Sequence, residues 1–268
     1  MPVKFLALIT SLLYLVAMCL QVSHIIQRRE QIDRTVFGLG VVALLGHAVV
    51  AWHSVVLDGV VNLGFYKIPA LFLLFINVAC IIGLLGRRPL QNLLVILFPL
   101  SVISVLVSTF APVSAAAQST LDGGMLVHVG SSILAYAVLT LAAIQAGVVA
   151  VQDHKLKQRH TRGIVQILPP LQLMERMLFE LIWIGVALLS LSIGSGIVFV
   201  EDIFAQHLVH KTVLTIIAWA LFSTLLWGHY QLGWRSQTAT RFTLAGFTLL
   251  MLAYFGSKLV LELILQRV

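Results

Sequence analysis

Long apolar stretches alternate with short polar or charged breaks along the whole chain. Eight of these stretches approach the roughly 20 residues that a helix needs to cross a bilayer. They are expected at 4–23, 35–57, 68–86, 90–111, 124–151, 178–200, 211–232 and 240–264. The pattern predicts an all-α integral membrane protein with eight transmembrane helices. We expect a single membrane domain over 1–268, whose first four helices lie in 1–112.

The breaks between the stretches carry residues that end helices or favour water. Gly and Pro flank two arginines at 86–89, and residues 112–124 are mostly small and polar. Residues 152–177 form the longest predicted loop, in which Pro169 and Pro170 interrupt any helix.

Composition supports a membrane protein and excludes two redox motifs. Hydrophobic residues make up 60% of the 268 residues and charged residues 10%, whereas a soluble domain carries about 25% charged residues. Cys19 and Cys80 lie in apolar stretches and form neither a CxxC nor a CxxCH motif. The N-terminal stretch has no clear small-x-small cleavage site, so we interpret it as a retained helix.

The net charge of +7 is unevenly distributed, and the distribution predicts the orientation in the membrane. Most Lys and Arg residues lie in the breaks after the first, third, fifth and seventh stretches. These breaks hold Arg28, Arg29, Arg34, Arg87, Arg88, Lys155, Lys157, Arg159, Arg162, Arg176, Arg235 and Arg241, and the opposite side holds Lys4, Lys67, Lys211 and Arg267. We therefore expect both termini to face the periplasm of a bacterial inner membrane.

The basic loop at 152–177 has two interpretations. Its charge marks the cytoplasmic side and attracts anionic lipids of the bilayer, or the loop docks another membrane or cytoplasmic protein. This distribution of charge does not indicate a nucleic-acid partner.

Histidines lie inside three apolar stretches, where an ionisable side chain is costly and usually functional. They are His47, His128 and His229. At a rise of about 1.5 Å per residue, His128 lies about 9 Å from the outer edge and His229 about 9 Å from the inner edge. These depths permit an outer site at His128 and an inner site at His229, while His47, near the middle, is able to serve either. His53 and His210 are outer alternates.

Each of these histidines shares a predicted helix face with small, polar or aromatic residues. The faces comprise Gly40, Ala43, His47, Ala51 and Ser54; His128, Ser131, Ser132 and Tyr136; and Thr215, Trp219, Phe222, Leu226 and His229. A small face lets helices pack closely or leaves room for a flat cofactor, and an aromatic face packs or forms a cofactor wall. A membrane histidine can also simply hydrogen-bond a neighbouring serine or carbonyl.

Haem fits the three histidines better than zinc does. Neutral imidazole is a common axial ligand of haem iron, and helical bundles hold such cofactors between facing helices. Zinc is less favoured because the chain has no HExxH motif and no cluster of Asp, Glu or Cys within a stretch. We therefore treat the three histidines as candidate haem-iron ligands, with Trp219 and Lys258 as further cofactor contacts. Lys258 either pairs with Glu262, four residues on, or meets a haem propionate.

Four ordered motifs lie in the second half of the chain, at 126–136, 188–198, 227–235 and 254–256. Together they resemble the CcsA/CcmC family of cytochrome c assembly proteins, and the whole chain is most similar to its YpjD-like branch, with HemX proteins as cousins. The resemblance implies a four-helix core at 120–264 and histidines that bind haem b. It matches His128 to an outer haem-facing histidine, His229 to a transmembrane ligand and His47 to an early-helix histidine of this branch.

The chain departs from that family where its synthetases present haem. Their tryptophan-rich WWD loop is expected between the sixth and seventh helices, but residues 200–207 read VEDIFAQH. A second outer histidine is also missing at 263–266, which read LILQ. We therefore expect haem binding, relay or sensing without thioether formation, and no enzymatic activity. The alternatives are a regulatory or scaffold subunit that has lost haem and, less favoured for want of interrupted helices, a transporter.

Overall fold

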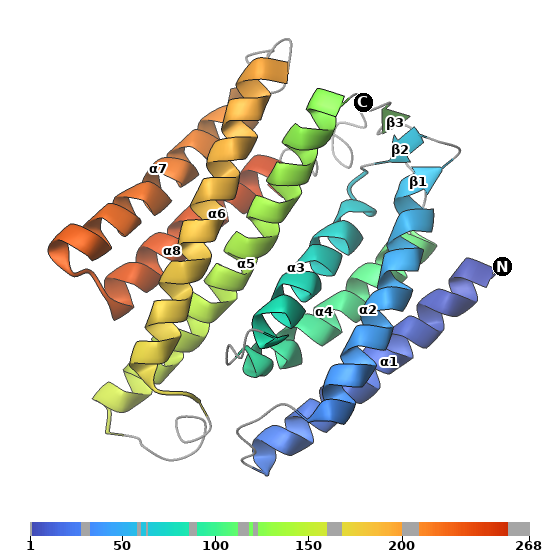
Figure 1. The fold of residues 1–268 in the computed structure, drawn as a ribbon, viewed down its shortest axis with the longest axis horizontal. Coiled ribbons are helices and arrows are strands. Elements are labelled where there is room, and N and C mark those ends of the chain that lie inside the picture. The colour runs from blue at the N-terminus through green and yellow to red at the C-terminus, as the bar shows by residue number, and fades with distance from the viewer. Residues whose placement is uncertain are drawn as a thin grey trace. The chain divides into compact units, whose positions relative to one another are not determined.

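Two compact units make up the fold, Met1–Thr120 and Leu121–Val268 (Figure 1). They are described from a computed structural model of the chain. The structure describes residues 2–27, 33–57, 60–62, 64–85, 90–111, 118–119, 123–159, 168–199 and 209–256. Residues 200–208 and 257–268, which include the stretch without the WWD motif and Lys258, lie outside the described residues.

The first unit combines four long helices with a small sheet. The helices are α1 (Pro2–Ile26), α2 (Arg34–Val55), α3 (Ile68–Leu85) and α4 (Leu94–Phe110), and the short 3-10 turn η1 (Gln91–Leu93) precedes α4. The strands β1 (Val56–Leu57), β2 (Val60–Asn62) and β3 (Gln118–Ser119) form an antiparallel sheet in the order β1-β2-β3.

The second unit contains the remaining long helices. They are α5 (Gly123–Lys157), α6 (Leu171–Phe199), α7 (Val209–Leu232) and α8 (Ser236–Met251), and α8 continues into the π-helical turn η4 (Leu252–Gly256). The hydroxyl of Tyr136 on α5 donates to the carbonyl of Leu250 at 3.0 Å. Tyr136 therefore ties α5 to α8 immediately before the π turn.

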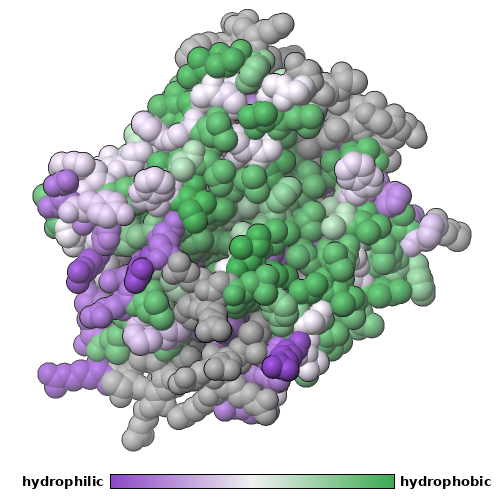
Figure 2. Space-filling view, viewed as in Figure 1, coloured by the Kyte–Doolittle hydropathy of each residue, from purple (hydrophilic) through white to green (hydrophobic). Residues whose placement is uncertain are grey.

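The eight predicted membrane stretches are confirmed as helices. Among the described residues, eight helices are long and apolar enough to cross a membrane. Large apolar side chains on them remain exposed, among them Phe5, Leu12, Trp183 and Trp227, and apolar residues cover much of the face in Figure 2. Broad exposed apolar surface is avoided in water, so these faces are suited to contact with lipid.

The predicted loop at 152–177 is too long. α5 continues to Lys157, and α6 begins at Leu171, directly after Pro170. Pro169 and Pro170 directly precede α6 and lie outside both helices, whereas charged residues on either side, such as Lys157 and Arg176, are helical. Asp153 pairs with Lys157 at 2.7 Å, four residues on, a spacing that supports a helix outside the bilayer.

The all-α prediction needs one addition, the small sheet. The stretch predicted as helical to residue 57 leaves the helix at Val55, and Val56 then pairs with Val61. Valine favours strands over helices. The sequence Asp58-Gly59, which follows the second predicted stretch, is also typical of two-residue hairpin loops.

Small residues allow α2 to pack closely against α1 and α4. A Cβ atom at Gly46 would lie 2.4 Å from Thr10 Oγ1, and one at Gly40 would lie 3.2 Å from the ring of Phe98. Ala43, on the same face, is fully buried. At these positions, the small residues of α2 therefore allow close helix packing, the first of the two interpretations of this face.

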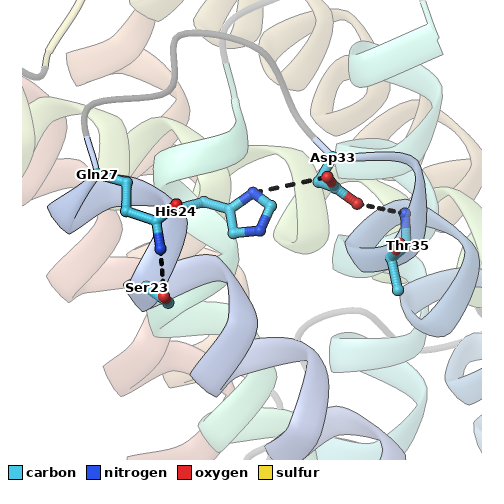
Figure 3. Close-up of polar contacts among 5 residues, drawn as sticks. All are labelled: Ser23, His24, Gln27, Asp33 and Thr35. Atoms are coloured by element: carbon cyan, nitrogen blue, oxygen red, sulfur yellow. Dashed lines mark hydrogen bonds and ion pairs between the residues drawn. The ribbon is translucent and has the colours of Figure 1, made fainter.

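An aspartate begins α2 and faces the end of α1 (Figure 3). Asp33 Oδ1 accepts a hydrogen bond from the backbone N–H of Thr35 at 2.7 Å, as an N-cap residue does. Its Oδ2 lies 4.0 Å from Nδ1 of His24. The carboxylate thus serves both as the cap of α2 and as a partner for the last turn of α1.

A buried lysine joins the start of α3 to the end of α4. Lys67 is 6% exposed, and its Nζ donates to the carbonyl of Ser108. Burial lowers the pKa of Lys67 because it disfavours the charged ammonium. The lysine satisfies a carbonyl in the last turn of α4 and so caps that helix.

Candidate functional site

His128 lies in the second turn of α5, with its ring against a glycine of α6. A Cβ atom at Gly196 would lie 3.0 Å from Cε1 of the imidazole and 3.1 Å from Nδ1. The same Nδ1 lies 2.9 Å from the carbonyl oxygen of Ser192. Gly196 therefore allows the ring to approach α6 closely enough to reach a backbone carbonyl.

Serines surround this contact and join α5 to α6. Ser132 Oγ lies 2.6 Å from Ser192 Oγ and 2.7 Å from the carbonyl of His128. Ser131 is 6% exposed and bonds the carbonyl of Val127 at 2.7 Å. The polar stripe predicted on the fifth helix thus faces the interior of the second unit.

His229 lies in the last turn of α7, between a ring of α6 and a backbone carbonyl. Its imidazole stacks on Phe179, with ring centroids 3.5 Å apart and planes inclined by 16°. Its Nδ1 lies 2.8 Å from the carbonyl oxygen of Trp234. Contacts on one face and one edge therefore fix the plane of the ring.

Two glycines explain how Trp234 reaches His229. Gly233 has φ +68°, a conformation that glycine adopts without steric cost, and it turns the chain back after α7. At Gly228, a Cβ atom would lie 2.3 to 2.6 Å from the indole of Trp234, so only glycine leaves room for the ring. The motif at 227–235 is thus a turn built around His229.

The partners of these rings determine which nitrogen carries the proton. A carbonyl oxygen only accepts hydrogen bonds, so Nδ1 of neutral His128 and Nδ1 of neutral His229 are the protonated atoms. Each Nε2 then carries the lone pair, and the described residues provide no hydrogen-bond partner for either Nε2. Histidines that bind metals usually donate their other N–H to a carbonyl or carboxylate in this way.

The two histidines of the second unit lie at different levels. His128 contacts α6 at Ser192, and His229 contacts it at Phe179. The two α6 positions are thirteen residues apart in the helix, which corresponds to about 20 Å along its axis. Two axial ligands of one haem bind the same iron atom, so His128 and His229 are too far apart to bind one haem together.

His47 lies in the first unit and is packed by protein on all sides. Its ring is fully buried, and Nδ1 lies 3.3 Å from the hydroxyl of Tyr14. Its Nε2 is buried without a hydrogen bond of ordinary geometry to any described residue, although the backbone of Ala70 interacts with the ring. Unlike the carbonyl partners of the other two histidines, a hydroxyl can donate or accept, so the tautomer of His47 is not fixed by Tyr14.

Of the remaining predicted contact residues, Trp219 hydrogen-bonds a serine rather than one of these histidines. Trp219 is 36% exposed, and its indole N–H donates to Ser190 Oγ at 2.8 Å. Lys258 lies outside the described residues. The outer alternates His53 and His210 are exposed.

The histidines stand singly rather than in a cluster. Across the part of the chain that the structure describes, no three His, Cys, Asp or Glu side chains come together. The chemistry available at each site is therefore that of one imidazole among apolar, aromatic and hydroxyl groups.

Sequence reasoning missed the residues that hold the rings. Phe179, Ser192 and Tyr14 contact the three histidines from other helices, and no spacing along the chain relates them. Gly196 and Gly233 were visible within the motifs at 188–198 and 227–235. Their roles require knowing which side chain approaches the glycine.

Comparison with known proteins places the chain among its relatives. The sequence model of the family described as "Cytochrome C assembly protein" matches residues 6–265. The chain belongs to this family. The match to this family covers nearly the whole chain and extends over both units of the fold.

Curated relatives of the chain agree with the predicted branch. The chain is 35% identical to the inner membrane protein YpjD of Escherichia coli K12, over 96% of this chain and 98% of the relative. It is 22% identical to protein HemX of Brevibacillus brevis, over 92% and 93% of the two chains. No solved structure matches the chain. The YpjD-like resemblance is confirmed, and the chain is a multi-pass inner-membrane protein.

Proposed function

We propose that this protein binds haem b at His128 and His229 and handles it in the membrane by binding, relay or sensing. We infer that it makes no covalent bond to haem, since 200–207 contain no tryptophan-rich platform. One observation carries the proposal: each of the two imidazoles faces a carbonyl with Nδ1 and leaves the Nε2 lone pair without a partner among the described residues.

The residues at both positions fit haem. Single neutral imidazoles are common axial ligands of haem iron; the His229 ring lies against aromatic rings, and the His128 ring lies beside the serines that join α5 to α6. The aromatic face of Phe179 supports His229, and Gly196 supports His128 without crowding it. When bound, haem supplies a redox-active iron whose potential depends on the basicity of the imidazole and on its hydrogen bonds.

The distribution of charge supports an orientation for the two sites. With the basic breaks in the cytoplasm, both termini and the His128 end of α5 lie at the periplasmic side, and the His229 end of α7 lies at the cytoplasmic side. We propose His47 as a third candidate ligand of the haem iron, and Trp219 and Lys258 as further contacts of the haem. To bind iron, the fully buried ring of His47 has to become accessible to the cofactor.

Absorption spectra of the detergent-purified protein, oxidised and reduced, test this function. We expect added haem to give a Soret band, and we expect His128→Ala and His229→Ala each to weaken binding at one site by at least about tenfold. The double variant loses both sites. His154→Ala, which changes an exposed histidine near the end of α5, serves as the matched control and leaves the spectrum unchanged.

A colourless protein that stays colourless after haem addition would overturn the proposal. The second candidate function, a regulatory or scaffold subunit, would then take its place. It is favoured by the basic residues Lys155 and Lys157 in the last turn of α5 and Arg159 just beyond it, all of which are exposed. A partner protein bound there is the occupant that this function requires.

A further inference from the structure

The turn that follows α7 is more elaborate than a helix end requires. Gly233 has φ +68° and Ser236 has φ 40°, so two residues in the left-handed region bracket Trp234 and Arg235. A non-glycine residue in that region costs on the order of 1 kcal/mol or more. Strain of this kind persists only where the surrounding structure requires it.

The backbone and the ring of Trp234 both have packing or hydrogen-bond partners. Its backbone N–H donates to the carbonyl of Gly228 at 3.2 Å, and its carbonyl reaches His229 Nδ1 at 2.8 Å. Its indole covers Gly228 and lies 5.2 Å, between centroids, from the ring of Phe242 on α8. The carbonyl that faces His229 is therefore a fixed acceptor.

This contact does not cap α7. The carbonyls that a helix end leaves without partners are its own last four, and α7 ends at Leu232. The carbonyl of Trp234 lies beyond them, in the connection to α8. The hydrogen bond between Trp234 and His229 therefore satisfies none of the free carbonyls at the end of α7. It constrains the imidazole of His229 instead.

We propose that the turn at 233–236, together with Phe179, is the device that sets the tautomer and orientation of His229, which makes Gly233, Trp234 and Phe179 positioning residues. The proposal rests on the proposed haem site at His229. The turn holds the proton on Nδ1 and leaves the lone pair on Nε2, and Phe179 fixes the plane of the ring. A donated Nδ1 hydrogen bond raises the basicity of a ligating imidazole.

Nitrogen NMR of the His229 ring in haem-free protein provides the first readout. We expect the Nδ1–H tautomer in the natural sequence and a mixture of tautomers in Gly233→Ala, because alanine is strained at φ +68°. Gly233→Asn should restore the natural tautomer, since asparagine tolerates the left-handed region. Gly147→Ala, where a Cβ meets nothing within 4 Å, is the matched control.

The haem-loaded protein provides the second readout. In Gly233→Ala we expect a higher midpoint potential and haem affinity about tenfold lower at this site, with recovery in Gly233→Asn. Phe179→Leu leaves the turn intact and should lower affinity while preserving the tautomer. Phe179→Leu therefore tests the positioning role even if Gly233→Ala does not fold.

The possible outcomes separate this inference from the haem proposal. A tautomer that changes in Gly233→Ala in a protein that never binds haem supports the positioning role and refutes the haem site. A tautomer and potential that stay the same in Gly233→Ala overturn the positioning role while leaving haem binding in place. The positioning role is likewise overturned if Phe179→Leu folds and leaves haem affinity unchanged.

Discussion

Single residues decide which histidines are able to serve as ligands. His128 and His229 face carbonyls, which only accept, so each keeps a lone pair on Nε2. His47 faces the hydroxyl of Tyr14 and is fully buried. The three imidazoles, equivalent in the sequence, therefore differ in their readiness to bind a metal.

Gly196 provides a test of how closely His128 is held. Gly196→Ala places a Cβ atom 3.0 Å from the imidazole, so the ring must shift and its bond to the Ser192 carbonyl weakens. We expect haem affinity at this site to fall by about three- to tenfold, corresponding to about 1 kcal/mol for one hydrogen bond. Gly194→Ala is the control, two residues away on α6 with nothing within 4 Å of its Cβ. Equal affinity in the two variants, measured by haem titration, would show that Gly196 does not position the ring.

At this scale, sequence reasoning identified the candidate ligands but not their surroundings. An ionisable residue inside an apolar stretch is visible without a fold, which is why His47, His128 and His229 were found. The stacking of Phe179 on His229 depends on two helices packing in one register. No periodicity within a single stretch contains that information.

Among the elements, α5 and α6 are longer than a bilayer requires. α5 has 35 residues, which corresponds to about 52 Å, against a hydrocarbon core of about 30 Å. The excess carries the exposed basic residues that follow Asp153. The second unit therefore presents a helical surface outside the membrane at the end that we assign to the cytoplasm.

The cap of α2 is an element-level feature with a measurable effect. Asp33→Ala removes the acceptor for the Thr35 N–H and should lower the free energy of unfolding by about 1 kcal/mol. Asp33→Ser keeps a capping oxygen and should lose much less. Chemical denaturation in detergent, followed by circular dichroism, measures both. Equal losses in the two variants would instead assign the effect to the carboxylate beside His24.

The sequence predicted the helices well and their ends less well. Apolar length alone locates a spanning helix, and Pro169 and Pro170 correctly separated the fifth and sixth. Charged residues were assigned to the loop, yet the Asp153–Lys157 pair continues α5. The sheet was missed because Val56 and Val61 pair across a turn, and two- and three-residue strands have no periodicity to detect.

For the molecule as a whole, the expected orientation would give the proposed sites at His128 and His229 different environments. Connecting segments on the cytoplasmic side of a membrane protein carry an excess of Lys and Arg, so the sequence of these segments alone predicts the orientation. Because His128 and His229 lie at different levels of α6, a reversed molecule would exchange the compartments that they face. The direction of any haem relay thus depends on the orientation.

Accessibility of introduced cysteines tests this orientation. In a Cys19→Ser, Cys80→Ser background, Gln158→Cys and His210→Cys place exposed thiols in the chain before and after α6. We expect a membrane-impermeant thiol reagent to label His210→Cys in spheroplasts and Gln158→Cys in inverted vesicles, because the excess of Lys and Arg predicts that the basic segment faces the cytoplasm. Detergent-solubilised samples, in which both thiols react, are the control for reactivity. The opposite labelling would put the His229 end at the periplasm, and labelling of both thiols in spheroplasts would mean that α6 does not cross the membrane.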